Sequence, residues 1–330
     1  MGRRLQLINW VNPILAPFGV RLDLASRYRT GKPVPLDATV DLSALEPALT
    51  PRLNFAILGS LEDHFASLPN LANHIRIFSL DAISPGGGED AHASVIPIRN
   101  VVAGKSGPTV FIERVVAGVS SMLEPKPDLI DLYSLQDLYK TKAEHHVHAL
   151  TLADIAREHG VLRWDYVRTD LEGTDFAIIE SLGSSIREIS MVEMELRAEP
   201  FYRGEPHMHD VLTYMCGQGF EVLDLKPERW RASTPNMLYE TRGRVTFCNT
   251  VFINRAKEAG TPVEILSHAL IVGLLGYANA AERLVMPLRK TCEPEVLTLQ
   301  RLLYQRATAR YLPWAGLPQV THDTSYLHDA

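Results

Sequence analysis

The sequence contains few cysteines and no uninterrupted apolar run long enough to span a membrane. Three cysteines are spread over 330 residues and no two of them form a CxxC pair. This spacing argues against a zinc ribbon or a thioredoxin-like site and favours reduced thiols in a cytoplasmic protein. The most apolar stretch, residues 263–285, is interrupted by four acidic, basic or imidazole side chains, which favours a buried helix over a transmembrane span: Glu264, His268, Glu282 and Arg283.

The sequence also lacks an excess of basic residues. It contains 33 Lys and Arg residues and 39 Asp and Glu residues, which give a formal net charge of -6. Nucleic-acid-binding proteins usually carry a basic surface, so we expect no nucleic-acid partner. Hydrophobic residues make up 46% of the chain, which is enough to bury a large core and excludes an intrinsically disordered protein.

We divide the chain into three parts. Residues 1–50 form an N-terminal extension, residues 51–255 an α/β domain, and residues 256–330 a helical C-terminal appendage. The apolar start of the extension is expected to be a short helix docked on the domain; the alternative is an interfacial anchor in weak peripheral contact with a membrane. The sequence leaves the oligomeric state open.

Short apolar runs alternate with helical patterns along the chain. We expect strands at residues 53–58, 74–80, 95–98, 109–113, 165–169, 186–196, 220–225 and 245–253. We expect helices at residues 62–68, 151–159, 174–182, 207–217, 263–280 and 295–311. This alternation predicts an α/β fold with a doubly wound, mostly parallel sheet. The last two strands have no helix between them and predict an antiparallel hairpin at one edge.

Three acidic residues surround the turn that follows the predicted strand at residues 165–169. Asp170 and Glu172 lie two positions apart, Gly173 permits a sharp turn, and Asp175 falls in the first turn of the next helix. Ligands of open parallel sheets bind at the carboxyl ends of the strands, so we expect these acids at the mouth of a site. The alternative is that they only shape the turn and the helix N-terminus.

Polar residues also follow the first two predicted strands. Gly59 and Ser60 come directly after the strand at residues 53–58, and Asp81 follows the strand at residues 74–80. An acid at the end of the second strand is where nucleotide-binding folds hold ribose hydroxyls. The chain has no GxGxxG motif, which disfavours an NAD-linked oxidoreductase.

Together these motifs resemble the FkbM-type S-adenosylmethionine-dependent methyltransferases. The family's stretch K-x-D-x-E-G-x-E reads here, from Arg168 to Asp175, RTDLEGTD, and residues 150–154, LTLAD, resemble its lead-in. Residues 118–121 look like the family's Ser-Ser loop, and residues 192–195 look like its next strand. The resemblance covers about residues 53–253.

The first loop departs from the family pattern D-V-G-A-N-x-G. Ile57 stands where the family has an acid, and Asp63 stands where it has the second glycine. The Lys of the acidic stretch is Arg168 here and its last Glu is Asp175; both changes keep the charge and alter the geometry. A non-catalytic scaffold in a biosynthetic complex is therefore the competing interpretation.

The resemblance implies a class I methyltransferase (Rossmann-like) fold with S-adenosyl-L-methionine as cofactor. The cofactor-binding residues would be Gly59, Ser60, Asp81 and Asp170. The implied reaction is methyl transfer to a hydroxyl on a sugar, a glycan or another natural product.

The expected catalytic residues are Asp170, Glu172 and Asp175. One carboxylate would act as general base on the acceptor hydroxyl. Alternatively, Asp170 and Glu172 would hold Mg²⁺, which prefers oxygen ligands.

Charged and imidazole side chains elsewhere are candidates for binding the acceptor. His146 and His148 would share a face if they lie on a strand, and we group them with Arg168 as possible substrate contacts; a metal site and ordinary surface histidines are the alternatives. The segment after residue 196 carries Arg197 and Arg203, which would contact the substrate or form a solvated charged loop.

Overall fold

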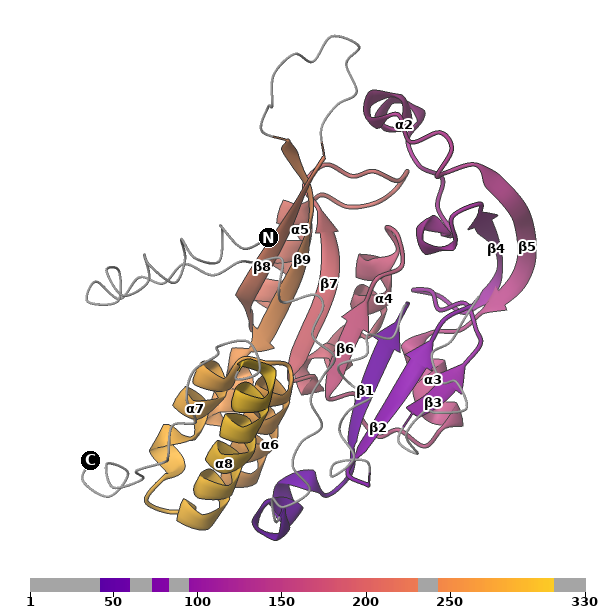
Figure 1. The fold of residues 1–330 in the computed structure, drawn as a ribbon. Helices are drawn as coiled ribbons and strands as arrows, with labels where there is room; N and C mark the ends of the chain where they lie inside the picture. Colours follow the sequence, from indigo (N-terminus) through magenta and orange to yellow (C-terminus); the bar gives the residue numbers. More distant parts are fainter. Residues whose placement is uncertain (1–41, 60–72, 83–94, 231–242, 312–330) are drawn as a thin grey trace, which may run out of the picture.

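A seven-stranded sheet forms the centre of the computed structural model, which describes residues 42–59, 73–82, 95–230 and 243–311 (Figure 1). The strand order is β3-β2-β1-β6-β7-β9-β8. The strands are β1 (Leu53–Leu58), β2 (Ile75–Leu80), β3 (Val95–Ile98), β6 (Tyr166–Thr169), β7 (Met191–Arg197), β8 (Phe220–Trp230) and β9 (Arg244–Asn254). The first five strands in the order are parallel, whereas β9 runs antiparallel to both β7 and β8. The predicted doubly wound sheet with an antiparallel edge is confirmed.

Side chains of each central strand alternate between two cores. In β1, Ala56 and Leu58 face one core, whereas Phe55 and Ile57 face the other. The first core is covered by three helices: α3 (Leu152–Glu158), α4 (Asp175–Ser181) and α5 (Met208–Gly217). Burial on both faces explains why β1 is apolar at every position except Asn54.

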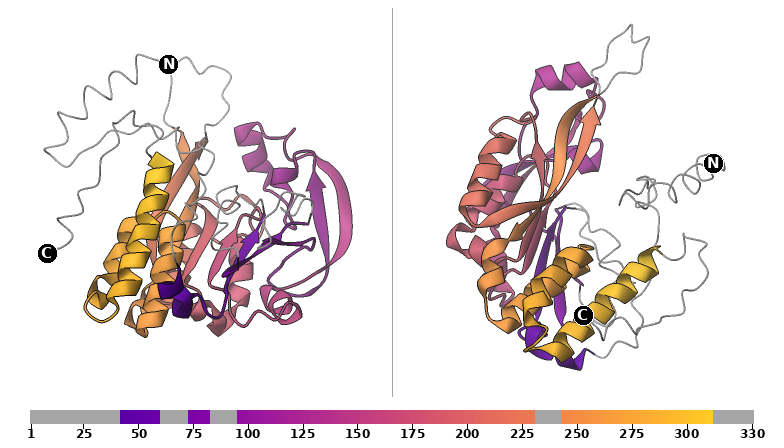
Figure 2. Two further views of the ribbon diagram at one scale, coloured as in Figure 1. Left: turned by 60° about the horizontal axis from the view of Figure 1, so that its bottom comes forward. Right: turned by 90° about the vertical axis from the view of Figure 1, so that its left-hand side faces the viewer.

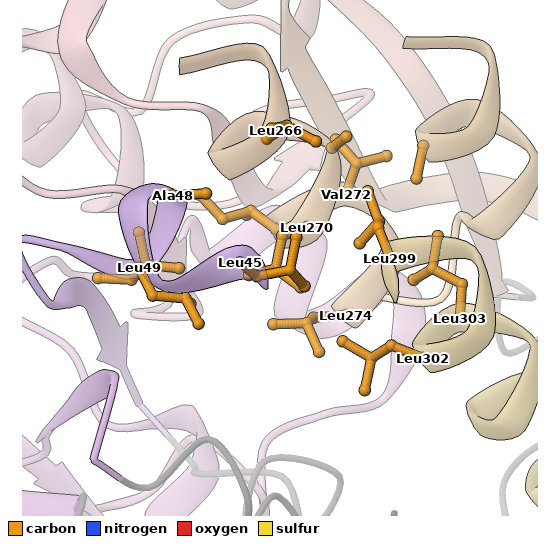
Figure 3. Packing of buried hydrophobic residues seen from close by; sticks show 14 of the residues in the cluster. Leu45, Ala48, Leu49, Leu266, Leu270, Val272, Leu274, Leu299, Leu302 and Leu303 are labelled. Carbon is orange, nitrogen blue, oxygen red and sulfur yellow. The ribbon is translucent and has the colours of Figure 1, made fainter. Parts of the chain in front are cut away.

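The second core is covered by the C-terminal helices and by a short helical segment that precedes β1. These are α6 (Pro262–Leu274), α7 (Ala278–Val285), α8 (Glu293–Tyr311) and the 3₁₀ helix η3 (Ser43–Leu49). Leu45 and Leu49 of η3 pack among Leu270 and Leu274 of α6 and Leu299 of α8 (Figure 3). The helices predicted as an appendage therefore share a core with the sheet, and Figure 2 shows them gathered on one side of the molecule.

A second, two-stranded sheet is inserted between β3 and β6. It consists of β4 (Gly107–Arg114) and β5 (Thr141–Ala149), which pair antiparallel, and α2 (Pro127–Tyr133) lies between them in sequence. Figure 1 shows α2 beyond the carboxyl ends of β6 and β7, opposite to the end where η3 lies. The inserted segment is thus placed to cover the edge at which ligands of such sheets bind.

Several helices and strands have different bounds in the structure from those that the sequence predicts. The strand predicted at residues 186–196 begins only at Met191, because Gly183–Glu188 forms a 3₁₀ helix, η6. The helix predicted at residues 263–280 is broken after Leu274, where Gly276 adopts a φ of 99°. The helix predicted at residues 62–68 lies outside the described residues.

In the described ranges, no helix is both long and apolar enough to cross a membrane.

The buried imidazole of His268 in α6 makes stability depend on pH. His268 is fully buried, neither ring nitrogen has a hydrogen-bond partner in the described part of the chain, and burial lowers its pKa to about 4. The unfolded chain therefore takes up a proton below pH 6.5 while the folded chain does not.

We predict that the free energy of unfolding falls by about 2 kcal/mol from this group between pH 7 and pH 4.5. Urea unfolding of the parental chain and of His268→Leu at both pH values measures the effect, because leucine cannot titrate. An equal loss of stability in both proteins would contradict the assignment.

Candidate functional site

Backbone hydrogen bonds join the carboxyl ends of β1, β2 and β6. The Gly59 N–H donates to the Leu80 carbonyl at 2.9 Å, and the Asp170 N–H donates to the Leu58 carbonyl at 3.1 Å. Gly59, Asp81 and Asp170 therefore lie at the ends of adjacent strands, along one edge of the sheet. Ser60 falls outside the described residues.

Gly59 allows the loop after β1 to lie directly on the loop after β6. Its φ is 94°, and a Cβ added there would lie 2.5 Å from the Asp170 carbonyl oxygen. Only a residue without a side chain fits this conformation and this contact without strain. The loop after β1 therefore requires glycine at position 59.

The three acids of the motif occupy different environments. The side chain of Asp170 is 34% exposed, and one of its carboxylate oxygens lies 3.5 Å from Nη2 of the buried Arg168. Glu172 is 13% exposed and Asp175 is almost fully buried. The acid that remains open to a bound molecule is therefore Asp170.

Asp175 holds the turn of the motif from inside. Its two carboxylate oxygens accept hydrogen bonds from the backbone N–H groups of Leu171, at 3.2 Å, and Gly173, at 3.3 Å. Burial raises its pKa, and the charge of Asp170 adds to this effect. These contacts give Asp175 a role in shaping the turn.

Glu172 is buried against a cation and a hydroxyl. Its Oε2 accepts a hydrogen bond from Arg197 Nη2 at 2.6 Å and another from the Tyr202 hydroxyl at 2.7 Å. Its backbone carbonyl accepts a hydrogen bond from Ser121 Oγ at 2.7 Å. Burial raises the pKa of Glu172 to about 7, although the charge of Arg197 acts in the opposite direction.

Arg197 is buried at the end of β7, so the alternative of a solvated charged loop is wrong for this residue, whereas a substrate contact stays a prediction. Besides Glu172, its guanidinium pairs with Glu195 at 2.5 Å and with Glu205 at 3.3 Å. It also lies over three aromatic rings, those of Phe201, Tyr202 and Phe247, at 5.3 to 5.5 Å from their centroids. The alternation of Glu193, Glu195 and Arg197 along one strand was the sequence signal for this cluster.

The histidines that we grouped as substrate contacts lie on the inserted sheet. His146 pairs with Val110 and His148 with Pro108, and these four residues line an open hollow of about 380 Å³. The neighbouring His145 binds Glu113 instead, at 2.9 Å. Within the described parts of the chain, no three His, Cys, Asp or Glu side chains are grouped so that they could hold a metal ion.

Comparison with known protein families places the motif in a recognised domain. Residues 93–222 match the family model described as the methyltransferase FkbM domain. The match confirms the resemblance to FkbM-type methyltransferases. The matched FkbM segment includes the acidic motif, Arg197 and Tyr202, and it ends before β9. No curated protein and no solved structure matches the chain.

The FkbM domain supports methyltransferase activity in general terms. The sheet of this chain extends the matched segment on both sides, because β1 and β2 precede it and β9 follows it. Gly59 and Asp81 therefore lie outside the matched segment, whereas Asp170, at the same edge of the sheet, lies inside it.

The contact between Gly59 and Asp170 leads to a stability prediction. Gly59→Ala would place a Cβ 2.5 Å from a backbone oxygen at a φ of 94°, so we expect a loss of about 1–3 kcal/mol in the free energy of unfolding. Gly217→Ala is the matched control, because a Cβ there meets nothing within 4 Å. Urea denaturation compares the two, and equal stability would show that the two loops are not in close contact.

Proposed function

We propose that this chain is an S-adenosylmethionine-dependent O-methyltransferase whose cofactor lies across the carboxyl ends of β1, β2 and β6. The observation that carries the proposal is the placement of Gly59, Asp81 and Asp170 at the ends of three adjacent strands. Open α/β sheets bind nucleotide-like ligands at this edge. The FkbM match supports the methyl-transfer chemistry.

The residues at this edge fit the proposed cofactor. Gly59 lets the loop after β1 lie against the Asp170 carbonyl, and this close contact brings the carboxyl ends of β1 and β6 together where the cofactor would bind. The carboxylate of Asp81, which is half-buried, would accept hydrogen bonds from the ribose hydroxyls. The cofactor, when bound, supplies an electrophilic methyl group on a sulfonium.

Asp170 is the proposed general base. The Asp170 carboxylate would take up the hydroxyl proton of the acceptor as the acceptor oxygen bonds to the methyl group, which a bound cofactor would supply while leaving as its neutral thioether. Asp170 is the most exposed acid of the motif, whereas the carboxylates of Glu172 and Asp175 are engaged inside the protein. Alignment of the acceptor oxygen with the methyl group would account for the remaining increase in the rate of methyl transfer.

The base mechanism is favoured over a Mg²⁺ site at Asp170 and Glu172. The Glu172 carboxylate already accepts hydrogen bonds from Arg197 and Tyr202, so metal binding would have to compete with a buried ion pair.

The acceptor is proposed to be a hydroxyl of a sugar, a glycan or another natural product. His146 and His148 stay candidate acceptor contacts, because both lie beside the open hollow of the inserted sheet.

Asp170→Asn tests the proposed base. We predict that this substitution lowers kcat by about 10²–10⁴-fold, because asparagine cannot take up the proton. The dissociation constant for the cofactor should stay close to the parental value, since the amide keeps the size and one acceptor oxygen. Transfer of a radiolabelled methyl group and calorimetry measure the two quantities. Asp137→Asn, at an exposed position outside the motif, is the control.

Chelation distinguishes the two mechanisms. EDTA should leave the parental rate unchanged if a carboxylate is the base, whereas loss of the rate and its recovery with magnesium would favour the metal. A parental rate in Asp170→Asn would show that Asp170 does not take the proton.

A further inference from the structure

Glu172 has a backbone conformation that needs support from elsewhere in the chain. Its φ is 54°, in the left-handed region that residues with a side chain rarely adopt. Such conformations cost free energy and persist where surrounding contacts hold them, often at functional sites. Glu172 lies two residues after Asp170, so its conformation sets the path of the chain beside the proposed base.

Three contacts from three separate segments hold Glu172 in this conformation, and we call this set the Glu172 clamp. Arg197, at the end of β7, and the hydroxyl of Tyr202 donate to the side chain, at 2.6 and 2.7 Å. Ser121, in the inserted segment, donates to the backbone carbonyl at 2.7 Å. The clamp therefore fixes both the side chain and the peptide of Glu172.

The residues of the clamp are themselves fixed. The carboxylate of Glu205 accepts hydrogen bonds from the backbone N–H groups of Phe201 and Tyr202, at 2.7 and 3.0 Å, and pairs with Arg197. The ring of Tyr202 lies against the motif, because a Cβ on Gly173 would come within 2.6 Å of it. These contacts leave the Tyr202 hydroxyl little freedom to turn away from Glu172.

We propose that Arg197 and Tyr202 are positioning residues, which act through Glu172 to hold the Asp170 carboxylate where it can reach the acceptor. This proposal rests on the proposed methyltransferase function. Neither residue touches the acceptor; each fixes the turn on which the base is carried. Loss of the clamp would lower the rate of the chemical step more than the affinity for the cofactor.

Tyr202→Phe is the least disruptive test, because it keeps the packed ring and removes only the hydroxyl. We expect kcat to fall about tenfold while the dissociation constant for S-adenosylmethionine changes by less than about twofold. Tyr133→Phe is the matched control, because Tyr133 packs in the same aromatic cluster and, among the described residues, forms no hydrogen bond with Glu172. A parental kcat in Tyr202→Phe, with or without a lower melting temperature, would overturn the proposal.

A double-variant cycle asks whether the hydroxyl acts through Glu172. If it does, Tyr202→Phe combined with Glu172→Gln should be no slower than Glu172→Gln alone. Independent, multiplying losses in the double variant would contradict a shared role. If Tyr202→Phe does not fold, Ser121→Ala replaces it in the same cycle, because Ser121 holds the same residue from its carbonyl side.

Amide hydrogen exchange tests the clamp without any activity measurement. The N–H groups of Leu171 and Gly173 donate to Asp175, so they should exchange faster in Tyr202→Phe and remain as protected as in the parental chain in Tyr133→Phe. Unchanged exchange in Tyr202→Phe would overturn the clamp. If the parental chain neither binds the cofactor nor transfers a methyl group, the proposed function fails, and the exchange measurement still decides whether the clamp exists.

Discussion

The buried ion pair between Arg197 and Glu172 constrains the arrangement of the whole site. A buried carboxylate needs a partner, and removing one member of such a pair typically costs about 3–5 kcal/mol. Arg197 meets this need from the neighbouring strand and pairs with Glu195 and Glu205 as well. The turn after β6, the end of β7 and the segment that carries Tyr202 can therefore pack in few ways, and Asp170 is left at the open edge.

The fold could be predicted largely from apolar runs, and the errors have physical causes. Strand β5 was not predicted because its side chains are mostly exposed, so no apolar alternation marks it; pairing with β4 forms it. The break after α6 was missed because apolar residues continue on both sides of Gly276. The packing of η3 on α6 joins segments about 220 residues apart in sequence, as in the hydrogen bond from Ser267 to the Ala48 carbonyl, and α8 lies still further along the chain. No local sequence pattern predicts such contacts.

The location of the candidate site residues at the ends of strands could be predicted, because ligands of open parallel sheets bind there. The burial and the contacts of each side chain could not be predicted. The spacing of Asp170, Glu172 and Asp175 indicated a cluster, but sequence does not show which acid points into the protein. That depends on Arg197 and Tyr202, which lie 25 and 30 residues beyond Glu172. The strained φ of Glu172 is likewise visible only once these contacts are in place.

Cofactor binding separates a methyltransferase from the two alternatives that its sequence left open, a scaffold without a cofactor and an NAD-linked oxidoreductase. The most direct measurement is titration calorimetry of the full chain with S-adenosylmethionine, with its demethylated product and with NAD. A site at the ends of β1, β2 and β6 predicts that the first two ligands bind with a stoichiometry of about one and that NAD does not bind. Heat from NAD alone, or from none of the three, would contradict the assignment of this edge as a methyl-donor site.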